Sequence, residues 1–294
     1  MVCVDSLTAT FPVRDYELGT TLTSGQAFRW QRQNESWIGV VHGRWIRLQQ
    51  TETSITAEAA EPICDWSWLA RYLQLDLDLG AVLRSFPVDA PMSSAMAACR
   101  GLRLLRQDPW ECLASFILSS TKQILQIQQI IALLCQRYGS EVPVPQRYPP
   151  AFTFPGPERL TRASEAELRA CKMGFRAPFL LAAARKIADG KLDLNALHEL
   201  PIEAARAELL SLAGVGRKIS DCVLLFAYGR QEAFPVDVWI MKALRELYFP
   251  RRKVNLQKLQ KFAGTYFGPN AGYAQQYLFH YARLQMKRGR QPNP

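Results

Sequence analysis

The sequence lacks the clusters of metal-binding residues that many enzymes use. It holds only three histidines in 294 residues, and its seven cysteines include no Cys-x-x-Cys pair. Zinc and iron–sulfur centres need several Cys or His ligands at short spacing. We therefore expect no metal site built from side chains.

Long apolar runs and targeting signals are lacking as well. No stretch approaches the roughly 18 apolar residues of a transmembrane helix, and residues 1–19 show no basic segment followed by an apolar core. We expect an intracellular protein, neither secreted nor in a membrane, in the cytoplasm or nucleoid of a bacterium or the nucleus of a eukaryote. The cysteines are odd in number and mostly flanked by apolar residues, which predicts reduced, buried thiols. They are Cys3, Cys64, Cys99, Cys112, Cys135, Cys171 and Cys222.

Negative charge is scarce relative to positive charge. The chain has 36 Lys and Arg against 26 Asp and Glu, a net charge of +10 and an isoelectric point near 9.4. This balance favours polyanionic partners, although charge alone leaves a merely basic protein as an alternative. Apolar residues make up 48% of the chain, enough for two or three packed units.

The hydrophobic pattern changes near residue 91 and predicts an α+β protein. From about 8 to 90, apolar and polar residues alternate as in an antiparallel sheet, with one helical stretch near 66–73. From 92 on, helical periods dominate; Asp108-Pro109 begins a helix that breaks near Ser119-Ser120, and a proline-rich ordered loop follows. We predict an N-terminal β-rich domain over 1–91 and a helical body over 92–294. We expect residues 262–290 to pack with the first domain or to line a pocket.

A helix–hairpin–helix is predicted at about 202–229. One helix ends near Leu212, the turn contains Gly214, Val215 and Gly216, and a second helix begins at Arg217. Glycines allow a sharp turn, and successive N–H groups beside a helix N-terminus form an anion pocket. In a basic protein this pocket suits a nucleic-acid phosphate; an ordinary turn between helices is the alternative.

Lys218 stands in the first turn of the second helix, an unfavourable place for a cation. The positive end of the helix dipole and any desolvation favour the neutral amine, which is a nucleophile able to form Schiff bases. Cys222 and Phe226 follow at four and eight residues, on the same helical face. Such a face would suit a pocket for a flat ring.

Asp237 is the carboxylate that we expect to act with this lysine. It follows Pro235 and precedes an apolar helical stretch, so it also fits an N-cap, and the two roles are compatible. Asp221 is the competing carboxylate. Its place on the same helix as Lys218 favours a solvated residue or one that supports the hairpin.

Motifs between residues 24 and 279 match one family in order. They are "SGQAFRW" (24–30), "GLRLLRQDPWECLASFILSS" (101–120), "GFRAPF" (174–179), "LAGVGRKISDC…AFPVDVW" (212–239) and "GPNAGYAQQYLF" (268–279). Together they resemble the eukaryotic-type 8-oxoguanine DNA glycosylase/AP lyases, within the superfamily defined by a helix–hairpin–helix, a Gly/Pro-rich loop and an aspartate.

The resemblance implies excision of a damaged guanine that is flipped out of duplex DNA. Lys218 would attack the sugar C1′ and form an imine that permits β-elimination, while Asp237 would stabilise the positive sugar. For the base pocket, the resemblance implies that the Gly25 carbonyl accepts the N7 proton of 8-oxoguanine and that Gln275 bonds the Watson–Crick edge. Phe279 and Cys222 would form the two stacking faces.

The chain departs from the family where the opposite base is read. Three asparagines are usual where this chain has Thr121, Lys122 and Gln123, and an arginine is usual near Gln126. Arg176 matches a cytosine-contacting arginine, with Arg169 as a candidate second. Phe175 replaces the usual wedge tyrosine, and Trp239 replaces a histidine. We predict weaker discrimination for cytosine, since each good polar contact is worth roughly 1–3 kcal/mol.

Two alternatives stay open. One is a related glycosylase for another oxidised or alkylated purine, although alkylation-specific members commonly lack the lysine and iron–sulfur members need four cysteines. The other is a non-catalytic DNA-binding module, which leaves Asp237 and Gln275 without a role. The family resemblance implies that the partner is double-stranded DNA containing oxidised guanine and that no organic cofactor is required. It also implies that the hairpin's backbone carbonyls could bind a cation. We expect a monomer.

Overall fold

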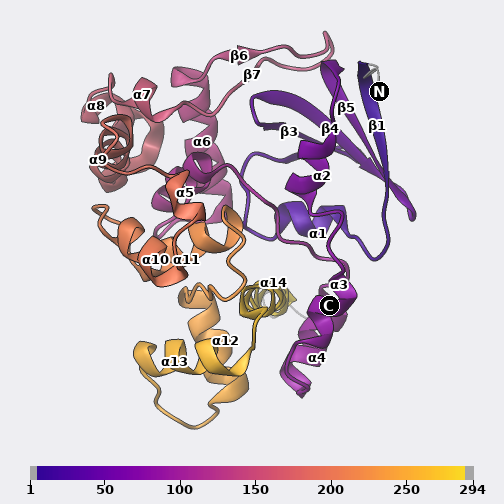
Figure 1. The fold of residues 1–294 in the computed structure, drawn as a ribbon, viewed down its shortest axis with the longest axis vertical. Helices are drawn as coiled ribbons and strands as arrows, with labels where there is room; N and C mark the ends of the chain where they lie inside the picture. Colours follow the sequence, from indigo (N-terminus) through magenta and orange to yellow (C-terminus); the bar gives the residue numbers. More distant parts are fainter. Residues whose placement is uncertain (1–4, 289–294) are drawn as a thin grey trace.

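The computed structural model describes residues 5–288, in which an antiparallel sheet lies beside a larger body of helices (Figure 1). The five strands are ordered β1-β5-β4-β3-β2. Their bounds are Ser6–Pro12 (β1), Gln31–Gln33 (β2), Ser36–Val41 (β3), Arg44–Gln50 (β4) and Ser54–Ile63 (β5). This arrangement confirms the predicted α+β class with an N-terminal antiparallel sheet.

The sheet buries one face because its central strands alternate. In β5, Ile55, Ala57 and Ala59 are buried while the residues between them are partly exposed, and Ala57 pairs with buried Leu48 of β4. Helices α1 (Leu18–Thr23) and α2 (Ser67–Leu73) contribute side chains such as Leu69 to the same apolar cluster. The alternation read from the sequence therefore corresponds to a half-buried sheet.

The helical body has its own, larger apolar core. Its helices are α3 (Leu79–Arg84), α4 (Ala90–Ala98), α5 (Pro109–Leu118), α6 (Ile124–Tyr138), α7 (Pro157–Leu160), α8 (Glu165–Leu168), α9 (Ala177–Ala188), α10 (Ile202–Leu210), α11 (Arg217–Phe226), α12 (Val238–Tyr248), α13 (Leu256–Tyr266) and α14 (Ala271–Arg288). Short helical turns cover Arg169–Met173, Gly174–Arg176 and Ala196–His198.

The start of α5 follows the predicted signal. The Asp108 carboxylate accepts a hydrogen bond from Glu111 N at 2.8 Å, and Pro109 is the first helical residue. The break after Leu118 lies where the sequence indicated it. We expected the proline-rich connection to be an ordered loop, but it contains regular structure. Strands β6 (Glu141–Val142) and β7 (Ala151–Phe152) pair within it, and α7 follows.

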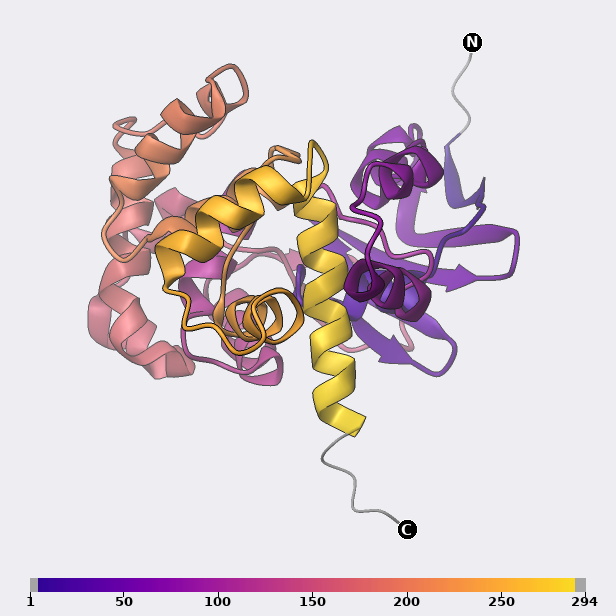
Figure 2. The ribbon, with the colours of Figure 1, turned by 90° about the horizontal axis from the view of Figure 1, so that it is seen from below.

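Helix α14 runs between the sheet domain and the rest of the helical body (Figure 2). Gln276 donates a hydrogen bond to the Ser24 carbonyl at 3.0 Å, and Tyr277 donates to the Leu102 carbonyl at 3.2 Å. The Tyr273 hydroxyl accepts from the backbone N–H of Leu104. The C-terminal helix therefore holds the segments near residues 24 and 103 against the helical body.

The prediction for the cysteines needs one correction. Cys64 is exposed and disulfide-bonded, so the expectation of a reduced, buried thiol is wrong there, and Cys3 lies outside the described residues. The free, buried cysteines are Cys99, Cys112, Cys135, Cys171 and Cys222. Between residues 5 and 288, no helix is long and apolar enough to span a membrane. No group of three or more metal-binding side chains gathers in that range either.

Candidate active site

The hairpin between α10 and α11 depends on a glycine. Gly214 has φ +79°, and a Cβ there would lie 2.5 Å from Cγ of Phe179, so both the backbone and the space require glycine. Gly216 forms the N-cap of α11 without a side-chain cap. The first N–H groups of α11 therefore remain available to an anion from outside the chain.

A buried ion pair holds the two hairpin helices together. Arg206 Nε of α10 lies 2.8 Å from Asp221 Oδ1 of α11, and both side chains are less than 10% exposed. Arg217 Nε lies 3.6 Å from the other oxygen of Asp221. Of the two roles expected for Asp221, the solvated one is wrong; the residue supports the hairpin.

Lys218 presents its amine at the edge of an apolar core. Its Nζ donates a hydrogen bond to Ser119 Oγ at 3.2 Å and lies 4.9 Å from the ring centroid of Phe116. Both partners come from α5 or its C-cap, and Lys218 itself is half-buried. Among residues 5–288, the amine therefore contacts one aromatic ring and has one hydrogen-bond partner, which is neutral.

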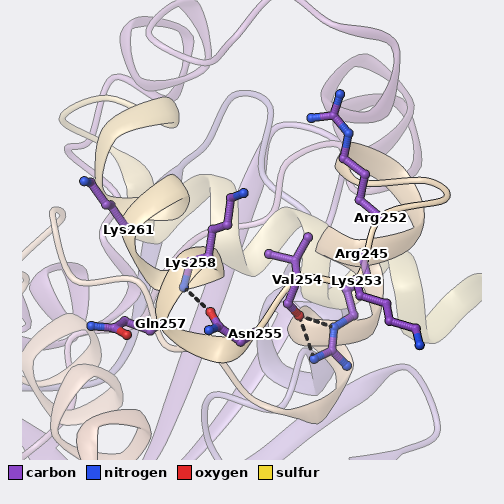
Figure 3. Close-up of a pocket in the computed structure, with 8 residues that line it drawn as sticks. All are labelled: Arg245, Arg252, Lys253, Val254, Asn255, Gln257, Lys258 and Lys261. Carbon is purple, nitrogen blue, oxygen red and sulfur yellow. Dashed lines mark hydrogen bonds between the residues drawn. The ribbon is translucent and has the colours of Figure 1, made fainter.

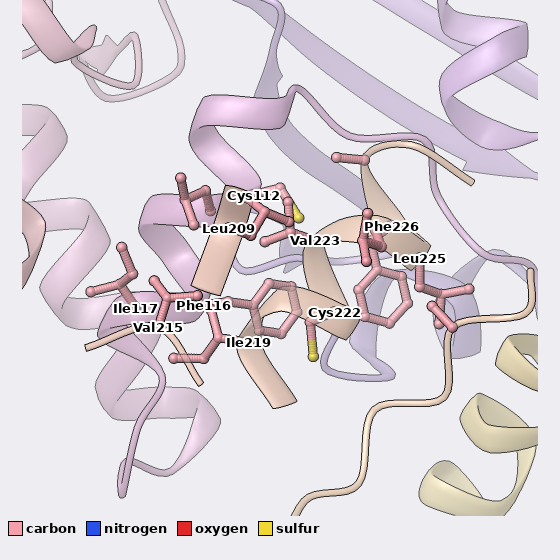
Figure 4. Packing of buried hydrophobic residues seen from close by; sticks show 14 of the residues in the cluster. Cys112, Phe116, Ile117, Leu209, Val215, Ile219, Cys222, Val223, Leu225 and Phe226 are labelled. Atoms are coloured by element: carbon pink, nitrogen blue, oxygen red, sulfur yellow. The ribbon is translucent and has the colours of Figure 1, made fainter. Parts of the chain in front are cut away.

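The side chains on the Lys218 face of α11 are buried (Figure 4). Burial raises the pKa of the Cys222 thiol to about 12, so this side chain is an uncharged, polarisable surface at neutral pH. Phe226 stacks on Phe116, with centroids 5.5 Å apart and ring planes within 13°. Phe226 thus packs in the core, and Phe116, which the sequence reasoning missed, contacts both Phe226 and the amine.

Asp237 caps α12, and its carboxyl is influenced by the charge of Lys218. Its Oδ1 accepts a hydrogen bond from Ile240 N at 2.8 Å, as predicted for an N-cap. Burial raises the pKa of the Asp237 carboxyl; the backbone N–H groups of Ile240 and Trp239 and the charges of Lys218 and Arg283 oppose that rise. The carboxylate lies within electrostatic reach of the amine, so the two can act as a pair.

Residues far apart in sequence meet at Gly25. Its φ is +84°, and a Cβ there would lie 3.0 Å from Ile124 Cδ1, 3.2 Å from Phe279 Cε1 and 3.4 Å from Arg283 Nη1. Gln275, one turn before Phe279 on α14, is buried, and its Oε1 has no hydrogen-bond partner among residues 5–288. An orphaned amide oxygen inside the fold is a group prepared to accept a bond from a ligand.

The turn between α5 and α6 is held by Arg176. This arginine is 2% exposed and donates hydrogen bonds to the carbonyls of Ser120 and Met173 and to the Thr121 hydroxyl. Thr121 itself has a left-handed backbone, with φ +57°. Both terminal nitrogens of the guanidinium are therefore engaged by the protein itself, while its Nε has no hydrogen-bond partner among residues 5–288.

The other predicted DNA-contacting residues are more exposed. Phe175 is 54% exposed, with the Arg176 guanidinium 4.2 Å from its ring centroid. Lys122 is half-buried, while the backbone N–H of Gln123 donates to the Gln126 side chain. The remaining two are Arg169, which pairs with Glu165 at 2.7 Å, and Trp239, which is half-buried in the first turn of α12.

A basic cavity of about 910 Å³ lies beyond the other end of α12 (Figure 3). Its lining has five cationic side chains and no carboxylate; they are Arg245, Arg252, Lys253, Lys258 and Lys261. The Arg245 guanidinium donates to the Val254 carbonyl at its edge. None of the predicted catalytic or base-pocket residues lines this cavity, so it is separate from the site around Lys218.

Comparison with known proteins identifies the family. Residues 9–113 match the family model for the N-terminal domain of 8-oxoguanine DNA glycosylase. Residues 114–265 match the model for HhH-GPD superfamily base excision DNA repair proteins. The chain belongs to the 8-oxoguanine DNA glycosylase family.

This glycosylase is similar to its relatives over most of its length. It is 32% identical to a probable N-glycosylase/DNA lyase of Methanothermobacter thermautotrophicus, over 68% of this chain and 69% of that one. It is 29% identical to the N-glycosylase/DNA lyase of Saccharomyces cerevisiae, over 89% and 82%. Among solved structures, the Clostridium acetobutylicum 8-oxoguanine glycosylase/lyase, in complex with DNA containing cytosine opposite 8-oxoguanine, superposes with a TM-score of 0.87. That match is 30% identical and covers 95% of this chain and 98% of the other.

Proposed function

We propose that this chain excises 8-oxoguanine from duplex DNA and then nicks the strand at the abasic site, as a bifunctional DNA glycosylase/AP lyase. The observation that carries the proposal is the half-buried amine of Lys218, which donates to Ser119 and lies over the ring of Phe116. Its charge also lowers the pKa of the Asp237 carboxyl, against the rise caused by burial. Lys218 stands on the hairpin of a chain that belongs to the 8-oxoguanine DNA glycosylase family.

Lys218 is the proposed nucleophile. Its neutral amine attacks C1′ of the extruded nucleotide, the bond between C1′ and N9 of the base breaks, and the base leaves with that electron pair. Loss of the amine proton and opening of the sugar ring give an imine. Removal of a C2′ proton then expels the 3′ phosphate by β-elimination, and water releases the enzyme from the imine.

Asp237 stabilises the positive charge that develops on the sugar when the base departs. The N-cap hydrogen bond and the charges of Lys218 and Arg283 oppose, in part, the rise in the pKa of its carboxyl that burial causes. A carboxylate fixed at a helix N-terminus needs no reorganisation during the reaction. Asp237 is therefore the electrostatic partner of the nucleophile.

The hairpin supplies the DNA contact. The open N–H groups at the start of α11 bind a backbone phosphate close to the nucleophile, and the net charge of +10 favours the duplex as a whole. One chain holds every proposed site residue, so we expect a monomer to suffice. The substrate places the enzyme in the compartment that contains the genome.

The chemistry uses no organic cofactor. We also propose that the hairpin's backbone carbonyls can hold a monovalent or divalent cation, because such cations prefer oxygen ligands. No step of the reaction is routed through this cation.

The opposite base should be read weakly. Arg176 is engaged with Ser120 and Thr121, and the usual asparagines are replaced by Thr121, Lys122 and Gln123. Each absent polar contact is worth roughly 1–3 kcal/mol of discrimination. We predict that the excision rate opposite adenine, guanine or thymine is lower than the rate opposite cytosine by no more than a few tens of times. Single-turnover rates on the four duplexes measure this, and a preference for cytosine of a thousandfold or more would contradict it.

The proposed function is tested by product analysis on duplex DNA containing one 8-oxoguanine. We expect the free damaged base and a strand nick at its position, and neither product with Lys218→Gln. Lys191→Gln is the matched control, because Lys191 is an exposed lysine that pairs with Asp189 at 2.9 Å, outside the hairpin. Base release without a nick would contradict the lyase assignment, and no release would leave a protein that only binds DNA.

A further inference from the structure

The Gly25 corner of the pocket contains a guanidinium for which the proposed reaction has no role so far. Arg283 of α14 has its Nη1 3.4 Å from the place where a Cβ on Gly25 would lie. Its Cζ lies 5.4 Å from the ring centroid of Phe279, the expected stacking face one turn earlier on the same helix. The arginine is therefore part of the wall of the base pocket.

The side chain of Arg283 is only lightly tied to the protein. Within residues 5–288, its guanidinium makes one long hydrogen bond, from Nη1 to the Thr23 carbonyl at 3.5 Å, and no carboxylate oxygen lies within 4 Å of it. A guanidinium carries five N–H donors in a rigid fork. Most of these donors remain free for a ligand, and the side chain can shift together with Phe279 when a base enters.

Arg283 is also coupled to Asp237. Burial lowers the pKa of Arg283 and the Asp237 carboxylate opposes that change, while Arg283 in turn opposes the rise at Asp237. The two charges therefore interact electrostatically. Arg283 thus lies at the Gly25 corner, and its charge interacts at a distance with the carboxylate that is proposed to stabilise the sugar.

Purine chemistry identifies what lies between those two points. In 8-oxoguanine, N9 carries the sugar and N7 carries the proton expected to bond the Gly25 carbonyl, and C8 joins N9 to N7. A donor beside the N7 contact at Gly25 can reach the substituent on C8, where the lesion has a carbonyl oxygen and guanine has only hydrogen. The other carbonyl on this edge is on C6, beyond C5, and it lies on the side of N7 away from the sugar. The electrostatic interaction of Arg283 with Asp237 favours the C8 side.

We propose that Arg283 is a specificity-determining residue that donates a hydrogen bond to the C8 carbonyl oxygen of the extruded base. The inference rests on the proposed function and adds to it a direct contact with the atom that distinguishes lesion from guanine. A hydrogen bond from a charged donor to a buried carbonyl changes affinity by about tenfold to a hundredfold. Such a contact also extends recognition to other purines with an 8-oxo group.

The test is binding to three non-cleavable duplexes with cytosine as the opposite base. One carries 2′-fluoro-8-oxoguanosine, one carries 2′-fluoroguanosine, and one carries a tetrahydrofuran abasic site. Arg283→Met keeps packing on Phe279 and removes the donors; we expect it to lose about tenfold to a hundredfold on the first duplex and less than twofold on the abasic one. Arg283→Lys should retain part of the difference.

Other outcomes overturn the inference in distinguishable ways. An equal loss on the abasic duplex would assign Arg283 to a phosphate, and unchanged binding with a lower melting temperature would assign it to packing alone. Arg14→Met, at a side chain 96% exposed on the sheet domain, controls for the loss of a positive charge. A wild-type protein that binds the 8-oxoguanine duplex no better than the guanine duplex would contradict the proposed function itself.

Discussion

Asp237 can combine the two roles that the sequence left open, since it caps α12 and interacts electrostatically with Lys218. The cap was predictable, because an aspartate directly before an apolar helical stretch is a local signal. The pairing with Lys218 was not a local signal, because nineteen positions and a loop separate the two residues. The sequence offered Asp237 as a candidate partner of the lysine with Asp221 as its competitor, and the family resemblance favoured Asp237.

Replacing Asp237 with asparagine separates these two roles. Asparagine is as good an N-cap as aspartate, so Asp237→Asn should unfold within about 1 kcal/mol of the wild type. Excision should fall by about 10²- to 10³-fold, because the charge that stabilises the sugar is lost. Thermal unfolding and single-turnover excision measure the two effects. Asp78→Asn, at the exposed N-cap of α3, should change neither, and a near-wild-type rate in Asp237→Asn would contradict the electrostatic role.

The pH dependence of excision follows from the same carboxyl. Burial raises the pKa of Asp237, so its active, ionised form is lost at a higher pH than for an ordinary aspartate as the solution is acidified. Single-turnover rates from pH 4 to 9 should show an acidic limb that belongs to this group. In Asp237→Asn that limb should disappear; if it persisted unchanged, another group would be responsible.

At the scale of elements, the hairpin is positioned by the pair between Arg206 and Asp221. The sequence predicted the two helices and the glycine turn, since both carry local signals. It did not establish whether Asp221 is buried, because an acidic residue on an amphipathic helix usually faces solvent. The structure shows that the polar pair crosses an otherwise apolar interface between α10 and α11.

Removing one partner of this pair should destabilise the protein. Arg206→Met leaves the Asp221 carboxylate buried with only the more distant Arg217, and unfolding should become easier by about 3–5 kcal/mol. The double variant with Asp221→Asn removes the buried charge and should recover part of that loss. Chemical denaturation of the two variants measures this; a single variant as stable as the wild type would contradict the account.

Element boundaries were predictable where caps and prolines mark them. The Asp108-Pro109 start of α5 is one example. The stretch after α8 carries no such mark: α8 ends at Leu168 and gives way to a turn in which Lys172 has φ +63° and Gly174 has φ +58°. Its apolar spacing resembles a helix, and nothing local announces a left-handed lysine.

At the scale of the whole molecule, the site is assembled from four distant stretches, near residues 25, 119–124, 218–237 and 275–283. Helix α14 brings the first and last together by running between the sheet domain and the other helices (Figure 2). Sequence motifs identified most members. Three members were missed, Phe116, Ile124 and Arg283, because their roles arise from contacts across the fold. In a sequence, an apolar residue of a site looks like a core residue, and a basic residue of a site looks like a surface residue.

The central claim is that Lys218 attacks the sugar and forms a covalent imine. The most direct test is borohydride reduction during reaction with an 8-oxoguanine duplex, followed by peptide mapping of the adduct. The account predicts one reducible protein–DNA adduct, located at Lys218 and absent in Lys218→Gln. An adduct at another amine, or one that persists in Lys218→Gln, would contradict the assignment of the nucleophile.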